Sequence, residues 1–147
     1  MTRAWRYVSE IAAAISSALA DGDEIAAVRA LCDGVNRLPD ARADGMLDEA
    51  LADPGDRAGS VEWTALLAGC VTYRLHSIGL SAPAWAAETS RLTRAWCPVV
   101  VSEAKWAYDL SGAPPELARL NIVWHERNLS SPRIMRRALV DGPGPEE

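Results

Sequence analysis

The feature that most constrains the fold of this chain is a helical repeat of apolar residues near its start. Apolar side chains recur every three or four positions, at Trp5, Val8, Ile11, Ala12, Ile15 and Leu19. This spacing places them on one face of an amphipathic helix, which we expect to end near Asp21 and Gly22.

Two further helices follow from the same spacing rule. Asp23 is a suitable N-cap for a helix that ends before Pro39, and Ser60 is a suitable N-cap for a third helix that ends at Gly79. The first two helices, joined by a short turn, form a predicted αα-hairpin. The third helix has a broad apolar face and is predicted to be central. The face comprises Trp63, Leu66, Leu67, Cys70, Val71, Leu75 and Ile78.

Proline divides the rest of the chain into short segments. We expect helices from Arg91 to Trp96, from 102 to 110, at the turn that opens at Pro114, and from Ser131 onward. Between Asp40 and Gly59 we expect one short helix and a loop, and residues 121–124 are the single candidate strand. The predicted fold is all-α: a single-domain helical bundle over residues 1–140, with a flexible acidic tail over 141–147.

Length and composition agree with one globular domain. A chain of 147 residues with 49% apolar and 24% charged residues can bury one core. Its 26 Ala, 6 Trp and no Phe leave Trp, Leu, Ile and Val to supply most of the buried area. The three widely spaced cysteines favour reduced core thiols. The absence of a signal peptide and of a long apolar run predicts a cytoplasmic protein with no membrane contact.

Charge is unevenly distributed along the chain. Residues 1–62 carry twelve acidic and six basic groups, whereas residues 91–137 carry four acidic and eight basic groups. Arg133, Arg136 and Arg137 share a predicted helical face and follow Arg127 closely. These arginines could meet an acidic protein partner or pair with the acidic segment around Asp44 to Asp56. Nucleic acid is the less favoured partner, because the chain has a net charge of -5.

Sequence motifs give little support to an enzyme. The two histidines lie apart from any nucleophile motif, and His76 fits a helix terminus better than a catalytic site. His125 stands beside Trp124 and Glu126, but no second spaced histidine or cysteine completes a metal site. No glycine-rich phosphate loop or calcium loop is present, so we expect neither a metal nor a cofactor.

The second half of the chain resembles a small helical actinobacterial domain of poorly known role. The matching residues are Trp63–Ala68, Pro83–Trp85, Leu92, Trp96–Pro98, Pro115–Leu117 and Asn121–Leu129. Such domains are often attached behind helix-turn-helix regulators of the Xre type and are suspected in toxin–antitoxin pairs. The resemblance implies an antitoxin-like or regulatory module that binds a protein such as a toxin or regulator. The first 60 residues carry no recognition-helix pattern.

Together these observations favour a non-enzymatic protein-interaction module, and a homo-oligomer is compatible with them. The alternative is a small enzyme or ligand-binding protein with a cleft near Trp85, Trp96 and His125. The predicted partner-binding residues are Arg127, Arg133, Arg136, Arg137, Trp85, Trp124 and His125.

Overall fold

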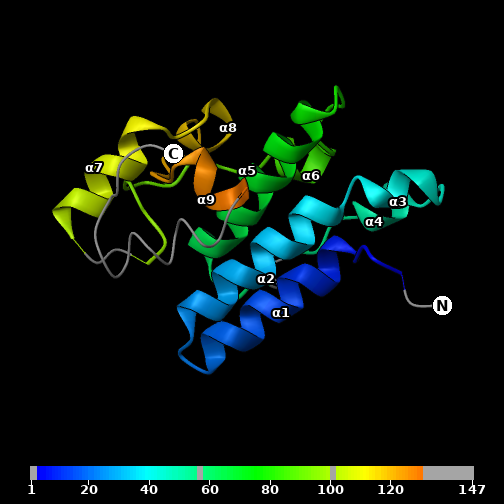
Figure 1. The fold of residues 1–147 in the computed structure, drawn as a ribbon, viewed down its shortest axis with the longest axis horizontal. Helices are drawn as coiled ribbons and strands as arrows, with labels where there is room; N and C mark the ends of the chain where they lie inside the picture. Colours follow the sequence, from blue (N-terminus) through cyan, green and yellow to red (C-terminus); the bar gives the residue numbers. More distant parts are fainter. Residues whose placement is uncertain (1–2, 56–57, 100–101, 131–147) are drawn as a thin grey trace.

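The computed structural model describes residues 3–55, 58–99 and 102–130, and within these ranges the chain is all-α (Figure 1). Most of the helices are short and surround one core. They are α1 (Val8–Ala20), α2 (Glu24–Arg37), α3 (Asp40–Ala43), α4 (Leu47–Ala50), α5 (Val61–Ser77), α6 (Ala84–Ala87), α7 (Glu103–Ser111), α8 (Pro115–Ala118) and α9 (Glu126–Ser130).

Helices α1 and α2 form the predicted αα-hairpin and lie side by side in Figure 1. The Asp23 side chain accepts a hydrogen bond of 2.9 Å from the Ala26 N–H, which caps α2 as expected. Gly22, with a φ of 74°, provides the left-handed turn between the helices. The axes approach closely at Gly34, where an added Cβ would lie 2.5 Å from Cγ1 of Ile11.

The central position predicted for the third helix is confirmed by α5. Ser60 accepts a hydrogen bond from the Trp63 N–H at its start, and Gly79 follows its C-terminal end with a φ of 76°. An unbroken run from Ala65 to Thr72 is buried. Because successive helical residues point in all directions around the axis, this burial shows that other elements surround the middle of α5.

The helix predicted from Arg91 to Trp96 is wrong. This segment is irregular and pairs with the chain after α8, because the Leu92 N–H donates to the Leu120 carbonyl and the Trp96 N–H to that of Asn121. The Val123 N–H donates in return to the Trp96 carbonyl, at 2.8 Å. The candidate strand at residues 121–124 does not form among the described residues, where its only β pairing is one isolated parallel bridge between Trp96 and Ile122.

Helices α7, α8 and α9 gather on the opposite side of α5 from α1 (Figure 1). Ser102 caps α7 and Pro115 begins α8, as the sequence predicts. Helix α9 precedes Ser131 and was not predicted. The helix expected from Ser131 onward lies outside the described residues. In the described part of the chain, no helix combines the length and apolar character needed to cross a bilayer.

Candidate functional site

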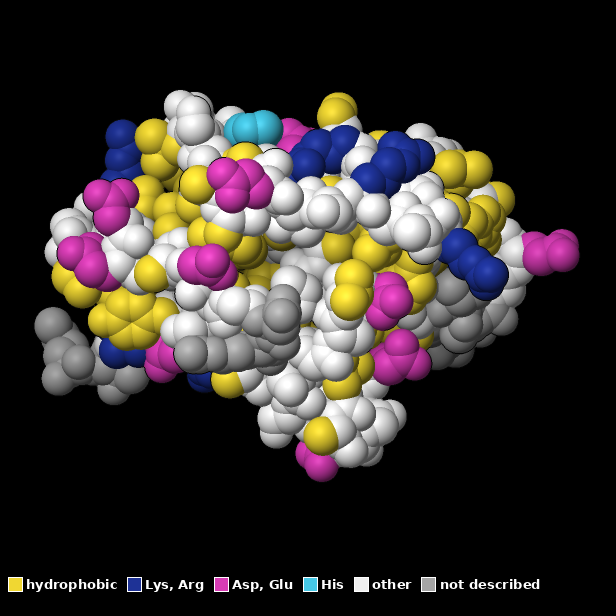
Figure 2. All heavy atoms as spheres, turned by 180° about the vertical axis from the view of Figure 1, so that it is seen from behind, with side chains coloured by type: hydrophobic (Ala, Val, Ile, Leu, Met, Phe, Trp, Pro, Cys, Tyr) yellow, Lys and Arg dark blue, Asp and Glu magenta, His cyan; other side chains and the backbone are white. Residues whose placement is uncertain are grey.

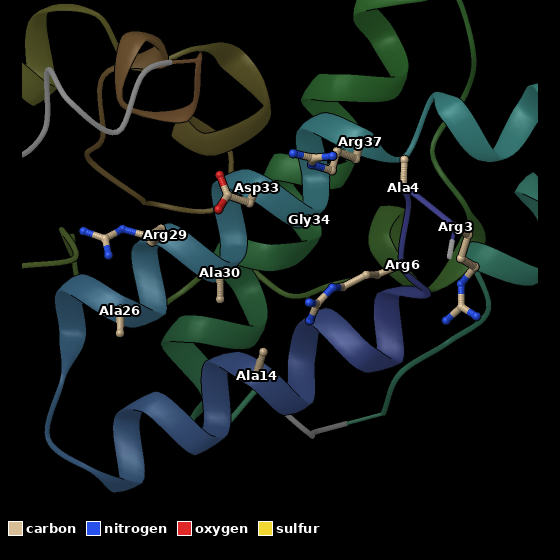
Figure 3. A pocket seen from close by; sticks show the side chains of 10 residues that line it. All are labelled: Arg3, Ala4, Arg6, Ala14, Ala26, Arg29, Ala30, Asp33, Gly34 and Arg37. Atoms are coloured by element: carbon tan, nitrogen blue, oxygen red, sulfur yellow. The ribbon is translucent and has the colours of Figure 1, made fainter. Parts of the chain in front are cut away.

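The first candidate site is a groove between α1 and α2, with a volume of about 490 Å³ (Figure 3). Small residues form its floor, and Figure 3 shows Ala14 of α1 and Ala30 of α2 pointing toward one another. Four arginines and one aspartate surround this floor. We call this set the arginine groove: Arg3, Ala4, Arg6, Ala14, Ala26, Arg29, Ala30, Asp33, Gly34 and Arg37.

The hairpin itself places the charged residues of the groove. Arg29, Asp33 and Arg37 follow one another at intervals of four residues, so they share one exposed face of α2. Arg6 lies just before α1, and Figure 3 shows its guanidinium reaching back over the space between the helices. The groove can stay open between the side chains because its floor consists of alanines and a glycine.

The arginines of the groove differ in the hydrogen bonds and ion pairs that they form with the rest of the chain. Arg3 forms an ion pair of 2.5 Å with Glu10 and lies over the rings of Trp5 and Tyr7. This pairing and a hydrogen bond from the Tyr7 N–H lower the pKa of Glu10, the backbone bond contributing most. Among the described residues, no hydrogen bond or ion pair within 4.0 Å connects Arg29 or Arg37 to another side chain, and Asp33 is not paired with either.

The face shown in Figure 2 is different in character. Acidic and basic side chains are interspersed there, and neither kind forms one continuous patch. Such mixing weakens the field at any one point, whereas the arginine groove gathers four arginines, one of them paired with Glu10, and one aspartate around one concavity. In an acidic chain, this local excess of positive charge makes the groove a candidate site for an anionic partner.

The predicted basic end lies largely outside the described residues. Arg127 is half-buried in α9, whereas Arg133, Arg136 and Arg137 fall in the part of the chain that the structure does not describe. Their role as a partner site therefore stays a prediction, and so does the alternative pairing with the segment from Asp44 to Asp56.

The aromatic residues predicted to bind a partner occupy different environments. Trp85 is half-buried, and its indole N–H donates a 2.7 Å hydrogen bond to the Leu51 carbonyl. Trp124 is completely buried and His125 is 7% exposed. A side chain that is buried in its own chain cannot contact a partner. We therefore correct the prediction for Trp124 and His125, which are not part of an exposed contact surface.

Of the three residues predicted to line a cleft, Trp85, Trp96 and His125, only Trp96 lines the second pocket between described residues. Trp96 lines a pocket of about 360 Å³, together with Leu92, Arg91 and Arg94 and with Val61 at the start of α5. Neither Trp85 nor His125 belongs to its lining. His125 instead stacks on Tyr108, with ring centroids 4.4 Å apart. Trp96 is therefore the one member of the predicted cleft that lies at this pocket.

A second candidate site, which sequence reasoning missed, is a buried polar cluster between α7 and α9. Lys105, Asp109 and Asn128 are all completely buried. One oxygen of Asp109, Oδ2, forms an ion pair with the Lys105 ammonium and accepts a hydrogen bond from the Cys97 thiol. The other, Oδ1, accepts from the Asn128 amide at 2.6 Å and from the His125 N–H at 3.1 Å.

The cluster connects α7 to α9 through the carboxylate of Asp109. Asp109 forms an ion pair with Lys105 of its own helix α7. It also accepts hydrogen bonds from Asn128 of α9, from the His125 N–H and from the Cys97 thiol. Asn128 also connects it to α2, because its carbonyl accepts from the Cys32 thiol at 3.4 Å. The Asn128 Oδ1 atom is buried without a partner in the described part of the chain. Such unsatisfied atoms are uncommon in folded proteins.

The sequence contained weak signals for both sites. Arg29, Asp33 and Arg37 repeat at helical spacing on the polar face of the second predicted helix, which indicates a charged ridge. Lys105 and Asp109 have the same spacing, but an ion pair on a helix surface gives the same pattern as a buried one. Nothing in the sequence alone identifies Asn128 as their neighbour.

The three cysteines are free and buried, as predicted from their spacing. Burial raises the pKa of the Cys32 thiol to about 12 and that of Cys70 well above its usual value. Burial and the neighbouring Asp109 carboxylate raise the pKa of Cys97 as well. Raised pKa values keep these thiols protonated, so they are poor nucleophiles in the folded chain.

Within residues 3–55, 58–99 and 102–130, no group of three histidine, cysteine or acidic side chains could hold a metal ion. Neither a family model, nor a curated protein sequence, nor a solved structure matches the chain.

Proposed function

We propose that this chain is a non-enzymatic interaction module whose arginine groove binds an acidic segment of a partner protein. The observation that carries the proposal is the concentration of four arginines around one concavity on a chain with a net charge of -5. Two of them, Arg29 and Arg37, are exposed and make no ion pair with their neighbour Asp33.

The chemistry of the groove suits carboxylates on a regular element. A guanidinium binds a carboxylate through two parallel hydrogen bonds, which gives direction as well as charge attraction. Arg29 and Arg37 are eight residues apart on α2, so their Cα atoms are separated by about 12 Å along the helix axis. Carboxylates two turns apart on a partner helix have the same separation, and the alanine floor lets the backbone of that helix come close.

A nucleic acid fits the groove less well. Its phosphates form a continuous line of negative charge, and Asp33 stands between Arg29 and Arg37 where that line would pass. The net charge of the chain also opposes approach to a polyanion over longer distances. A protein segment can avoid Asp33 by placing a neutral residue there.

The antitoxin-like or regulatory role implied by the resemblance of residues 63–129 is part of this proposal. A toxin or a regulator with an acidic surface helix would be a suitable partner. Arg127, Arg133, Arg136 and Arg137 would add a second basic contact at the other end of the chain.

The test uses a defined peptide in place of the unknown partner. We expect a helix-forming peptide with glutamates two turns apart to bind the full chain and to shift the amide NMR signals of α1 and α2. The matched peptide with glutamine at those positions should bind at least about tenfold more weakly. Raising the salt concentration should weaken binding of the glutamate peptide, because exposed charges are screened.

Two double variants with the same change in net charge distinguish binding in the groove from a general effect of net charge. Arg29→Glu with Arg37→Glu should weaken binding of the glutamate peptide about tenfold or more. Arg91→Glu with Arg94→Glu places the same charges on exposed positions near Trp96 and should have little effect. Equal losses in the two variants, or no preference for the glutamate peptide, would exclude the arginine groove as the site.

A further inference from the structure

The buried polar cluster holds an amine and a primary amide against one carboxylate, in a space that water does not reach. Lys105, Asp109 and Asn128 are each 0% exposed. The carboxylate lies between the other two groups: Lys105 Nζ contacts its Oδ2, and Asn128 Nδ2 donates to its Oδ1 at 2.6 Å. The amine and the side-chain amide are thus held against the two oxygens of one carboxylate.

These are the groups that an amide exchange between side chains requires. We propose that Lys105 and Asn128 become joined by a covalent amide bond, with Asp109 as the group that carries the protons. The bond would connect α7 to α9 through the interior of the protein. Nothing in this inference depends on the arginine groove.

The reaction balances within the cluster. The Lys105 ammonium gives one proton to Asp109, and the neutral amine then forms a bond from Nζ to Cγ of Asn128. The C–N bond of the asparagine side chain breaks, and its nitrogen leaves as ammonia after it receives a second proton from Nζ. Asp109 is left protonated, Lys105 and Asn128 share a neutral amide, and no oxidant or other reactant is needed.

Burial supplies both the driving force and the protection from side reactions. An ion pair in the interior has lost the hydration of two charges, a cost that its mutual attraction often fails to offset. The products carry no charge at Lys105 or Asp109, so that cost is removed. Exclusion of water leaves the lysine amine without a competing nucleophile at the asparagine carbon.

The unpartnered oxygen of Asn128 is consistent with this reaction. Oδ1 has no hydrogen-bond donor in the described part of the chain, whereas Nδ2 is held by Asp109. Oxygen and nitrogen of a primary amide exchange places by rotation about the Cβ–Cγ bond. After that rotation a protonated Asp109 can donate to the carbonyl oxygen, which polarises the carbon for attack.

Mass spectrometry of the full wild-type chain tests the proposal directly. After incubation at neutral pH, the intact mass should lie ~17 Da below the mass of the sequence, the difference being one ammonia molecule. Trypsin does not cleave after an acylated lysine, so the digest should contain residues 95–119, uncleaved at Lys105, joined to residues 128–133. A wild-type chain of full mass would overturn the proposal and leave an ordinary buried ion pair.

Variants identify the atoms that react. Asp109→Asn removes the proton carrier and should restore the full mass. The double variant Lys105→Met with Asp109→Leu removes both buried charges together, which favours folding, and should also have the full mass. Asn36→Ala changes another asparagine near α9 and should retain the deficit. A deficit that persists in the double variant would assign the lost ammonia to cyclisation of an asparagine with its own backbone and would overturn the cross-link.

Discussion

At the scale of single residues, Gly34 determines how closely the hairpin can pack. An added Cβ would lie 2.5 Å from Cγ1 and 2.7 Å from Cδ1 of Ile11, which is completely enclosed in the core. Because Ile11 has no free space to move into, the two helices must separate or the isoleucine must adopt a strained rotamer. The same glycine forms part of the floor of the arginine groove.

We expect Gly34→Ala to destabilise the protein by about 1–3 kcal/mol, although alanine is the better helix former. Urea denaturation monitored by circular dichroism measures this cost. In the Ile11→Ala background the same substitution should cost at least about 0.5 kcal/mol less, because the clashing atoms are absent. Strictly additive costs would show that the contact between Gly34 and Ile11 does not limit the approach of α1 and α2.

At the scale of the elements, α5 contributes the longest run of buried residues to the core. Leu67 lies in the middle of its buried run and is completely enclosed. We expect Leu67→Ala to lower the free energy of unfolding by roughly 2–5 kcal/mol, because the cavity it leaves cannot collapse from all sides. Val61→Ala, at a site 73% exposed on the same helix, is the matched control and should change stability by less than about 0.5 kcal/mol. Similar costs at the two sites would contradict the central position of α5.

The elements that could be predicted from sequence are those whose pattern follows one rule throughout. In α2 and α5 the cap residue, the apolar period and the proline or glycine at the end agree, and in α1 the apolar period and the glycine at the end agree; the structure confirms these three helices. The segment from Arg91 to Trp96 has an apolar spacing compatible with a helix. Its backbone instead finds partners at Leu120 and Asn121, contacts that a local pattern cannot reveal.

Helix α7 shows why the buried polar cluster could not be predicted. Its existence and its N-cap follow from the sequence, but its orientation does not. The charged residues Lys105 and Asp109 face inward, whereas Leu110 is 60% exposed. A rule that buries apolar residues assigns the opposite face to the core, because it takes no account of the polar partners that Asn128 and Cys97 provide from elsewhere in the chain.

At the scale of the whole molecule, one apolar core extends over both halves of the described chain. It includes Trp5 and Val8 at one end of the sequence and Trp124 and Leu129 at the other. Partly buried hydrogen bonds reinforce this connection, since Asn36 of α2 donates to the Leu129 carbonyl and Arg74 of α5 donates to Asn36. A core shared in this way predicts that the hairpin and the C-terminal helices unfold together.

The three cysteines report on that cooperativity, because they lie in α2, in α5 and in the irregular segment before α7. Burial raises all three thiol pKa values in the folded chain, so at pH 8 the thiolate fraction is much smaller when the chain is folded. For an acid whose pKa is raised on folding, stability is present below the unfolded value of 9.0 and decreases as the pH rises above it. We therefore expect slow reaction with a thiol reagent at pH 8, rapid reaction in denaturant, and faster opening above pH 9.

Three variants that each retain one cysteine should become reactive at the same urea concentration. If Cys97 reacts at a clearly lower concentration than Cys32 and Cys70, the C-terminal helices open independently and the protein is not one cooperative unit.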